Sequence, residues 1–305
     1  MIILPTLACT YNPERIRFPV IAMPKIDGVR GVNFNGRLTG RSLKEHRNTF
    51  VTERFSAFKL RGLDGELALG NPTDPDLCRR TSSALSTIAG SPDVKWYLFD
   101  IMLTTEIRQR EPYYKRVQRV DLWVDYLQDT SPELAEHLRV IKYLYIHDWP
   151  SLQAYHASNI EAGYEGTVFR DPDSRYKYGR STVNDQCLMR IKDFVVDEAR
   201  VLSVKEGRTN NNLPTVDARG LTERSTHSEN MEPSGQIGTL ICQDLTTGDT
   251  ISVSPGRMPH ADREYYWNAQ EQIIGRTVKY QHFPHGRKDS PRMATFQCFR
   301  SEEDM

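Results

Sequence analysis

The chain has 305 residues, of which 38% are hydrophobic and 26% charged, and its 40 basic side chains balance 40 acidic ones. This composition is typical of a globular protein of about two domains, and it excludes collagen, a coiled coil and wholesale disorder. No apolar run approaches the roughly 20 residues of a membrane span, and the N-terminus lacks the basic start of a signal peptide, so we expect a cytoplasmic protein.

The first predicted elements are strands and a helix. The apolar run Val20–Met23 predicts a strand. Asn35-Gly36 lies between two short extended segments and predicts a hairpin, because both turn residues need positive φ. Ser42-Leu-Lys-Glu45 has the spacing of a capping box and predicts the start of a helix. The apolar residues spaced to share one face of that helix are Phe50, Val51, Phe55 and Phe58.

The rest of the first half predicts two more helices and five strands. Apolar residues at spacings of three and four predict an amphipathic helix over residues 113–127. A second helix is predicted over residues 150–162, ending at Gly163. The predicted strands are Leu63–Leu69, Val94–Leu103, Arg139–Ile146, Gly166–Arg170 and Cys187–Ile191.

The second half has a different texture, with short strands and little helix. Residues 207–235 are polar and poor in large apolar side chains, which predicts a long exposed loop. One helix is predicted over residues 262–274. The predicted strands are Glu198–Val204, Ile237–Cys242, Thr250–Ser254, Arg276–Phe283 and Met293–Arg300. Five short strands with one helix favour a small β-barrel of the OB type. We therefore expect two domains, residues 1–193 and 194–305.

Cysteine and histidine spacing argues against a disulfide framework or a zinc site. The five cysteines are far apart and form no CxxC pair, and the eight histidines form no HxxxH or HExxH pattern. We expect reduced thiols. The zero net charge gives no hint of a nucleic-acid partner, so any contact with DNA must come from local basic patches.

The sharpest chemical signal is Lys25-Ile-Asp27-Gly28-Val-Arg30, which lies between a predicted strand and a predicted hairpin. The motif fits a polar turn with glycine at positive φ. It also fits a nucleophilic lysine, which must lose its proton before it can attack. Asp27 could then orient Lys25, and Arg30 could hold an anion or a hydroxyl group.

Further motifs follow in order along the chain. Each is more often structural than functional when it occurs alone. They are Arg41, Asp64-Gly-Glu66-Leu67, Tyr97-Leu-Phe99-Asp100, Glu165-Gly-Thr-Val168 and Arg190-Ile-Lys192. Together they supply a lysine, carboxylates for a cation, an aromatic ring for a base and cations for phosphates. Phosphoryl or nucleotidyl transfer requires such a set.

With these motifs in this order, the sequence resembles the ATP-dependent DNA ligases of the small bacteriophage type, in the covalent nucleotidyltransferase superfamily. The resemblance spans about residues 20–305. It implies an α+β fold with two parts: an ATP-grasp-like adenylation (nucleotidyltransferase) domain and a C-terminal OB-fold β-barrel. It also implies a protein that uses ATP to seal nicked double-stranded DNA through lysine-AMP and AMP-DNA. We expect a monomer, because nothing in the sequence indicates an oligomerisation interface. For a viral source, the location would be the host cytoplasm.

The resemblance assigns roles to individual residues. The implied catalytic residues are Lys25, which becomes AMP-lysine, and Asp27, Arg30, Arg190 and Lys192. The residues implied to bind ATP are Lys25, Arg30, Arg41, Glu66, Phe99, Glu165, Arg190 and Lys192, with Phe99 stacking on adenine. Glu165 and Glu66 are implied to hold Mg²⁺ or Mn²⁺. The arginines expected to contact DNA are Arg41, Arg219, Arg224, Arg292 and Arg300.

The sequence departs from the family pattern at two places. Arg190 stands where the family usually has lysine, and it keeps the charge without the compact ammonium. Thr295 stands where a basic residue is common, so Arg292 and Arg300 are both candidates for the arginine that assists attack on ATP.

Three alternatives remain at this stage. An mRNA-capping guanylyltransferase or an RNA ligase would share the lysine motif. A non-catalytic nucleic-acid-binding OB protein would bind DNA without adenylylation.

Overall fold

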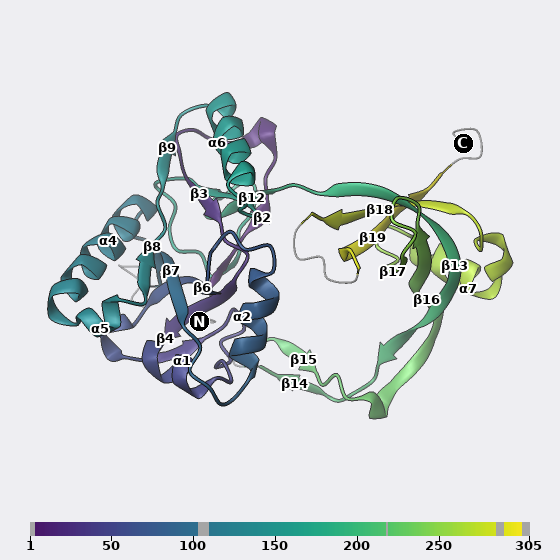
Figure 1. Cartoon of the computed structure of the whole chain (residues 1–305), viewed down its shortest axis with the longest axis horizontal. Helices are drawn as coiled ribbons and strands as arrows, with labels where there is room; N and C mark the ends of the chain where they lie inside the picture. Colours follow the sequence, from purple (N-terminus) through teal and green to yellow (C-terminus); the bar gives the residue numbers. More distant parts are fainter. Residues whose placement is uncertain (1–3, 103–109, 218, 285–289, 301–305) are drawn as a thin grey trace. The chain divides into compact units, whose positions relative to one another are not determined.

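The computed structural model describes residues 4–102, 110–217, 219–284 and 290–300. The chain divides into two compact units, and Figure 1 labels most of their elements. Unit 1 contains Met1–Lys192 and Asp217–Leu221, and unit 2 contains Asp193–Val216 and Thr222–Met305. Among the described residues, no helix combines the length and the apolar character needed to cross a membrane.

The first sheet of unit 1 ends at the lysine motif. Its strands in spatial order are β2 (Cys9–Thr10), β12 (Met189–Lys192), β10 (Gly166–Arg170), β3 (Val20–Lys25) and β9 (Leu144–Ile146). The apolar run of β3 is buried on both faces, which explains why it does not alternate with polar residues. Helix α6 (Trp149–Glu161) packs against β10 and β3, and their shared core forms one face of this sheet (Figure 1).

The second sheet of unit 1 carries the other motifs. Its strands in spatial order are β5 (Arg37–Thr39), β4 (Val29–Phe34), β6 (Leu63–Leu69), β7 (Val94–Ile101) and β8 (Leu138–Val140). The helices that surround it are α1 (Thr49–Phe55), α2 (Leu77–Ser86), α4 (Tyr113–Thr130) and α5 (Pro132–Ala135). A separate short pair joins β1 (Thr6–Leu7) to β11 (Gly179–Arg180). A core of side chains from both large sheets lies between them.

Several local predictions for this unit are confirmed. The helix predicted over residues 113–127 is α4, and its predicted apolar stripe is buried. The helix predicted over residues 150–162 is α6, and Gly163 follows it at a φ of 90°. In the β4–β5 hairpin, Asn35 and Gly36 have φ values of 51° and 84°, as the turn requires.

Two local predictions are wrong. No helix begins at Ser42. Helix α1 begins at Thr49, because the side chain of Asn48 accepts a hydrogen bond from the Val51 backbone N–H at 2.9 Å and caps the helix there. Phe58 lies beyond α1 and is 79% exposed. The predicted strand over residues 139–146 is two strands, β8 and β9, which belong to different sheets.

Unit 2 is built on one antiparallel sheet. Its strands in spatial order are β17 (Thr250–Val253), β16 (Met231–Asp244), β13 (Val195–Asn210), β18 (Thr277–Phe283) and β19 (Arg292–Phe299). Helix α7 (His260–Asn268) packs on β16 and ends before the predicted residue 274. In the described residues the two edge strands meet through one bridge, between Ser254 and Thr295. The sheet is therefore curled, but strand pairing does not close it into the predicted barrel.

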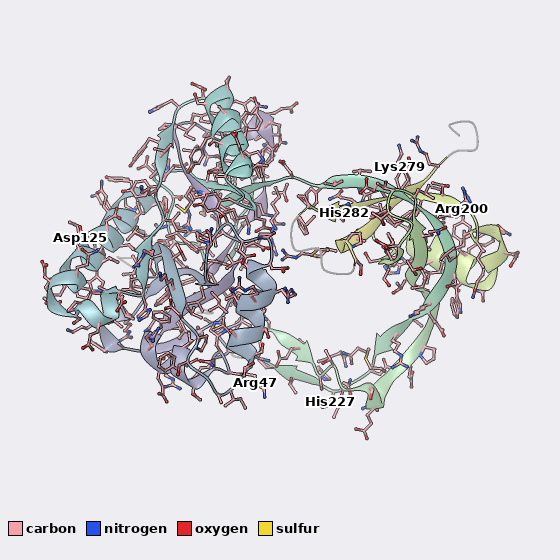
Figure 2. All side chains as sticks on the ribbon, in the orientation of Figure 1. Arg47, Asp125, Arg200, His227, Lys279 and His282 are labelled. Atoms are coloured by element: carbon pink, nitrogen blue, oxygen red, sulfur yellow. The ribbon has the colours of Figure 1, made fainter. Side chains whose placement is uncertain are left out.

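The exposed loop predicted over residues 207–235 is also wrong. Strand β13 continues to Asn210, β16 begins at Met231, and a short hairpin of β14 (Pro214–Val216) and β15 (Thr222–Arg224) lies between them. Most of these residues are exposed. The segment is held by backbone hydrogen bonds and has no buried face. Its sequence therefore shows no alternation of apolar and polar residues. Figure 2 shows the side chains of the sheet, among them Arg200, Lys279 and His282.

Candidate active site

A cavity opens between the two large sheets of unit 1, and strand alternation determines its walls. Successive side chains of a strand point to opposite faces. On β12, Met189 and Ile191 pack in the core against α6, so Arg190 and Lys192 point toward the second sheet. The first sheet and its flanks contribute Pro24, Lys25, Ile26, Val168, Arg170 and Leu188 to the cavity wall. The second contributes Arg30, Glu66, Phe99 and Ile141.

Strand register brings two lysines and one carboxylate together. Gly166 begins β10 and lies opposite Lys25 on β3 and opposite Lys192 on β12. Glu165 precedes it, and the Glu165 backbone N–H donates to the Lys25 carbonyl at 3.1 Å. A side chain at Gly166 would place its Cβ 2.2 Å from the Ile191 carbonyl oxygen, so glycine is required where these strands meet.

The carboxylate of Glu165 is shared between the two lysines. Nζ of Lys25 donates to Oε2, and Nζ of Lys192 donates to Oε1. Burial acts to raise the pKa of Glu165, but the two ammonium groups outweigh it and hold the pKa below its usual value. Burial and the neighbouring Lys25 lower the pKa of Lys192. Two ammonium groups against one carboxylate leave local positive charge, which suits a phosphate.

On the second sheet, Arg30 is held by a buried carboxylate, that of Asp64. Arg30 makes a two-pronged pair with Asp64, with Nε–Oδ1 at 2.5 Å and Nη2–Oδ2 at 2.7 Å. Asp64 is fully buried and also accepts a hydrogen bond from the Tyr176 hydroxyl at 2.7 Å. This geometry fixes the Arg30 guanidinium. Glu66 lies opposite Arg30 on β6, and burial raises the pKa of Glu66 to about 7, against the opposing charges of Lys25 and Arg30.

A β-bulge in β7 supplies the aromatic side of the cavity. Asp64 pairs with Asp100, but Gly65 pairs with Leu98, so Phe99 is the extra residue. Leu98 packs in the core beneath α4, while Phe99 reaches the cavity. The bulge also lets the next residue, Asp100, point into the space between the sheets. Bulges of this kind often redirect side chains next to active sites.

The comparisons with known proteins agree with this arrangement. No protein-family model matches the chain, and no curated protein matches it. Two solved structures of Chlorella virus DNA ligase-adenylate are 25% and 27% identical to the chain, cover 98% and 100% of it and all of their own length, and superpose with a TM-score of 0.54. The chain therefore shares its fold, over its whole length, with solved DNA ligases.

More distant ligases share the fold. A Lig E DNA ligase, described as binding DNA with a minimal scaffold, is 19% identical, with a TM-score of 0.69 over 98% of this chain and 100% of its own. The ATP-dependent DNA ligase of bacteriophage T7, in complex with ATP, is 16% identical, with a TM-score of 0.51 over 97% and 98%. The resemblance drawn from the sequence motifs is thus confirmed.

The predicted site residues of this ligase are only partly brought together. Lys25, Arg30, Glu66 and Phe99 line the cavity, and Glu165 and Lys192 meet Lys25 beside it. Asp27 is half-buried. Its negative charge helps to raise the pKa of Glu66, although burial and then the charge of Glu165 raise that pKa more. Arg190 is half-buried on the cavity face of β12. Arg41 is exposed after β5, and its predicted contacts stay predictions.

The remaining predicted DNA-contacting arginines lie outside this cavity and make internal contacts. Arg219 pairs with an aspartate two residues before it, and Arg224 donates to a backbone carbonyl of the same segment. Arg292 lies over an aromatic ring, and Arg300 Nε donates to Glu198 at 2.5 Å. Their role toward DNA stays a prediction.

Sequence reasoning missed three residues that shape the cavity. The sequence shows Asp64 as part of an acidic pair, but it does not reveal Asp64 as the partner of Arg30. It shows Asp100 only as the neighbour of Phe99, and Arg170 only as the end of a predicted strand. The available signal was the placement of charged residues at strand positions that are otherwise apolar, where a charge must be paired if it is buried.

Proposed function

We propose that this ligase seals a nick between a 3′-hydroxyl and a 5′-phosphate in double-stranded DNA, with ATP as the energy source. The observation that carries the proposal is the position of Lys25. Its amine lies in the wall of a cavity that also presents the Phe99 ring and the half-buried Arg30, and it donates to the shared carboxylate of Glu165 beside the cavity. A nucleotide needs these groups in one place: a stacking surface, cations for phosphate and a nucleophile.

The first step charges Lys25 with AMP. The lysine must lose its ammonium proton before it can attack. The free amine then forms a nitrogen–phosphorus bond to the α-phosphate, and the bond from that phosphorus to pyrophosphate breaks. Lys192 and Arg190 lie on the same strand face and offset the charge of the α-phosphate, while Phe99 stacks on the adenine.

The next two steps transfer AMP and join the strands. An oxygen of the 5′-phosphate attacks the AMP phosphorus, the bond to Lys25 breaks, and the amine takes up a proton. The 3′-hydroxyl then loses its proton and attacks the 5′-phosphate, and AMP leaves. In both steps the cations of the cavity stabilise charge that develops on phosphate oxygens.

A divalent metal fits the carboxylates of the site. Among the described residues no cluster of three metal-ligating side chains occurs, so the protein alone does not build a closed metal site. Glu165 and Glu66 are close enough for the charge of Glu165 to raise the pKa of Glu66. Two carboxylates, with phosphate oxygens and waters, suit Mg²⁺ or Mn²⁺. The metal would neutralise charge on the transferring phosphate.

The same proposal assigns the two parts of the chain. Residues 1–193 act as the adenylation domain, and residues 194–305 act as a domain of the OB type, in a monomer. Arg41, Arg219, Arg224, Arg292 and Arg300 contact the DNA backbone, and Arg292 or Arg300 assists attack on ATP. Their charge and their place outside the nucleotide cavity support the contacts with DNA.

Labelled ATP and three substrates test the proposal. We expect the protein with Mg²⁺ and α-labelled ATP to carry an acid-labile label, and γ-labelled ATP to give none. GTP should not label the protein, a result that distinguishes it from a capping guanylyltransferase. A nick in DNA should be sealed faster than a nick in RNA, which distinguishes it from an RNA ligase. Lys25→Ala should fail on an ordinary nick but retain sealing of a nick that already carries AMP. DNA binding without any labelling would support the non-catalytic alternative instead.

A further inference from the structure

Arg170 is a buried cation in the wall of the nucleotide cavity, and the function proposed above gives it no role. It ends β10, four residues after Gly166, and its side chain lies on the same face as Val168. Arg170 is 1% exposed. Its guanidinium carbon lies 5.5 Å from the ring centroid of Phe99, the residue at the bulge. A fully buried arginine requires both a counter-ion and partners for its N–H groups.

The counter-ion is present and rigidly held. Nη1 of Arg170 donates to Oδ2 of Asp100, which is itself fully buried. Arg116 binds the same carboxylate through Nε at 2.8 Å and Nη2 at 3.2 Å. The Arg170 guanidinium carbon lies over the Tyr113 ring, 4.3 Å from the ring centroid. Since each neighbour is buried, the guanidinium is fixed before any ligand arrives.

One donor of this guanidinium has no partner. Of the buried side-chain polar atoms in the described residues, two make no hydrogen bond: Oε2 of Glu111 and Nε of Arg170. Only Arg170 belongs to the cavity wall. Arginine does not lose its proton, so the Nε–H remains a donor at any working pH. An unpaired buried donor is unfavourable unless a bound ligand supplies the acceptor.

The position beside Phe99 points to the kind of acceptor. A base stacked on that ring presents ring nitrogens at its edge, while the phosphates extend toward the lysines. We propose that Arg170 is a specificity-determining residue, which donates a hydrogen bond to a ring nitrogen of the purine stacked on Phe99. This inference rests on the proposed function, because it places the adenine of ATP in this cavity.

Base analogues test the contact without any mutation. Adenine has three ring acceptors, which are removed one at a time in 1-deaza-, 3-deaza- and 7-deaza-ATP. We expect one of the three analogues to lose about tenfold or more in kcat/KM for labelling of Lys25, because a hydrogen bond to a charged donor is lost. The other two should stay within about threefold of ATP.

A variant then identifies the donor. In Arg170→Met the sensitive analogue and ATP should react equally, whereas the exposed control Arg119→Met should keep the full penalty. If Arg170→Met does not fold, Arg170→Lys replaces it, since it keeps a charge for Asp100 and should shrink the penalty. The inference is overturned if all three analogues match ATP in the wild type, or if the penalty persists undiminished in the Arg170 variant.

A second readout separates this inference from the proposed function. The dissociation constants of the four nucleotides are measured by calorimetry, which needs no adenylylation. Labelling by ATP with no difference among the analogues overturns the role of Arg170 alone. Absence of labelling with ATP overturns the proposed function, and the calorimetric series still decides whether Arg170 contacts the base.

Discussion

The two walls of the cavity hold Lys25 and Arg30 in opposite ways. On the wall from β3, β10 and β12, Lys25 and Lys192 compete for the single carboxylate of Glu165. On the opposite wall, Arg30 makes a two-pronged pair with Asp64, whose carboxylate also accepts a hydrogen bond from the Tyr176 hydroxyl. The number of partners per cation therefore differs between walls that face the same space.

This difference matches the role that we propose for each wall. Groups that react must exchange partners and protons during the cycle. When two lysines share one carboxylate, either lysine can leave it while the other keeps it paired. Groups that only bind the nucleotide gain from being fixed in advance, since less freedom is lost on binding. The comparison predicts that damage to the fixed wall first reduces stability, and that damage to the shared wall first reduces chemistry.

The largest expected effect comes from the fixed wall. Asp64→Asn leaves Arg30 buried without its counter-ion, so the free energy of unfolding should fall by about 3–5 kcal/mol in denaturant titration. The matched control is Asp171→Asn, whose partner Arg17 is 54% exposed, and it should cost less than about 1 kcal/mol. Equal losses for the two variants would contradict the distinction between the walls.

The next effect comes from the shared wall. Glu165→Gln keeps the shape of the side chain but removes the charge that positions both lysines. We expect the rate of Lys25 labelling to fall about 100-fold, while the melting temperature changes little. Glu161→Gln, at an exposed position of α6, should change neither. A large loss of stability with an unchanged rate would reverse the assignment of the walls.

A smaller effect is expected at the bulge. Phe99→Leu keeps apolar volume but removes the stacking surface, so the KM for ATP should rise about tenfold with little change in kcat. Phe58→Leu serves as control, because Phe58 is 79% exposed and outside the cavity. Steady-state kinetics of adenylylation measure both, and a fall in kcat alone would speak against a stacking role.

The last expected effect is a pH dependence of stability at Glu66. Its pKa in the folded protein is raised to about 7 from a usual value of 4.5, mainly by burial. The folded state thus binds the proton more tightly, so this group favours folding below about pH 4.5 and loses that contribution as the pH rises through about 7. Without metal, Glu66→Gln should melt above the wild type at pH 8 and show no advantage at pH 4.5. The reverse order would show that the carboxylate is not buried.

Much of the cavity could be predicted from sequence, because its residues belong to short motifs in or beside strands. The Lys25 motif, Glu66, Phe99 and Glu165 were all identified as candidates, and the cavity gathers them from two sheets. What sequence could not supply was the pairing of Arg30 with Asp64, since pairing depends on register. The bulge that turns Phe99 and Asp100 toward the cavity has no signal in local composition.

The fold of the second half was harder to predict, for a physical reason. The outer parts of β13 and β16 are held by backbone hydrogen bonds and are largely exposed, so they leave no hydrophobic period. A polar stretch therefore suggested a loop over residues 207–235. Similarly, the spacing of a capping box at Ser42 was overridden by Asn48, whose side chain caps α1 six residues further along the chain.

The most direct test locates the AMP on the protein. Lys25 and Lys192 contact the same carboxylate, so either amine could in principle receive the nucleotide. Incubation with ATP and Mg²⁺, followed by proteolysis under conditions that preserve the phosphoramide bond and by mass spectrometry, distinguishes them. The account predicts AMP on the peptide containing Lys25 and none on the peptide containing Lys192. AMP on Lys192, or on no lysine at all, would contradict it.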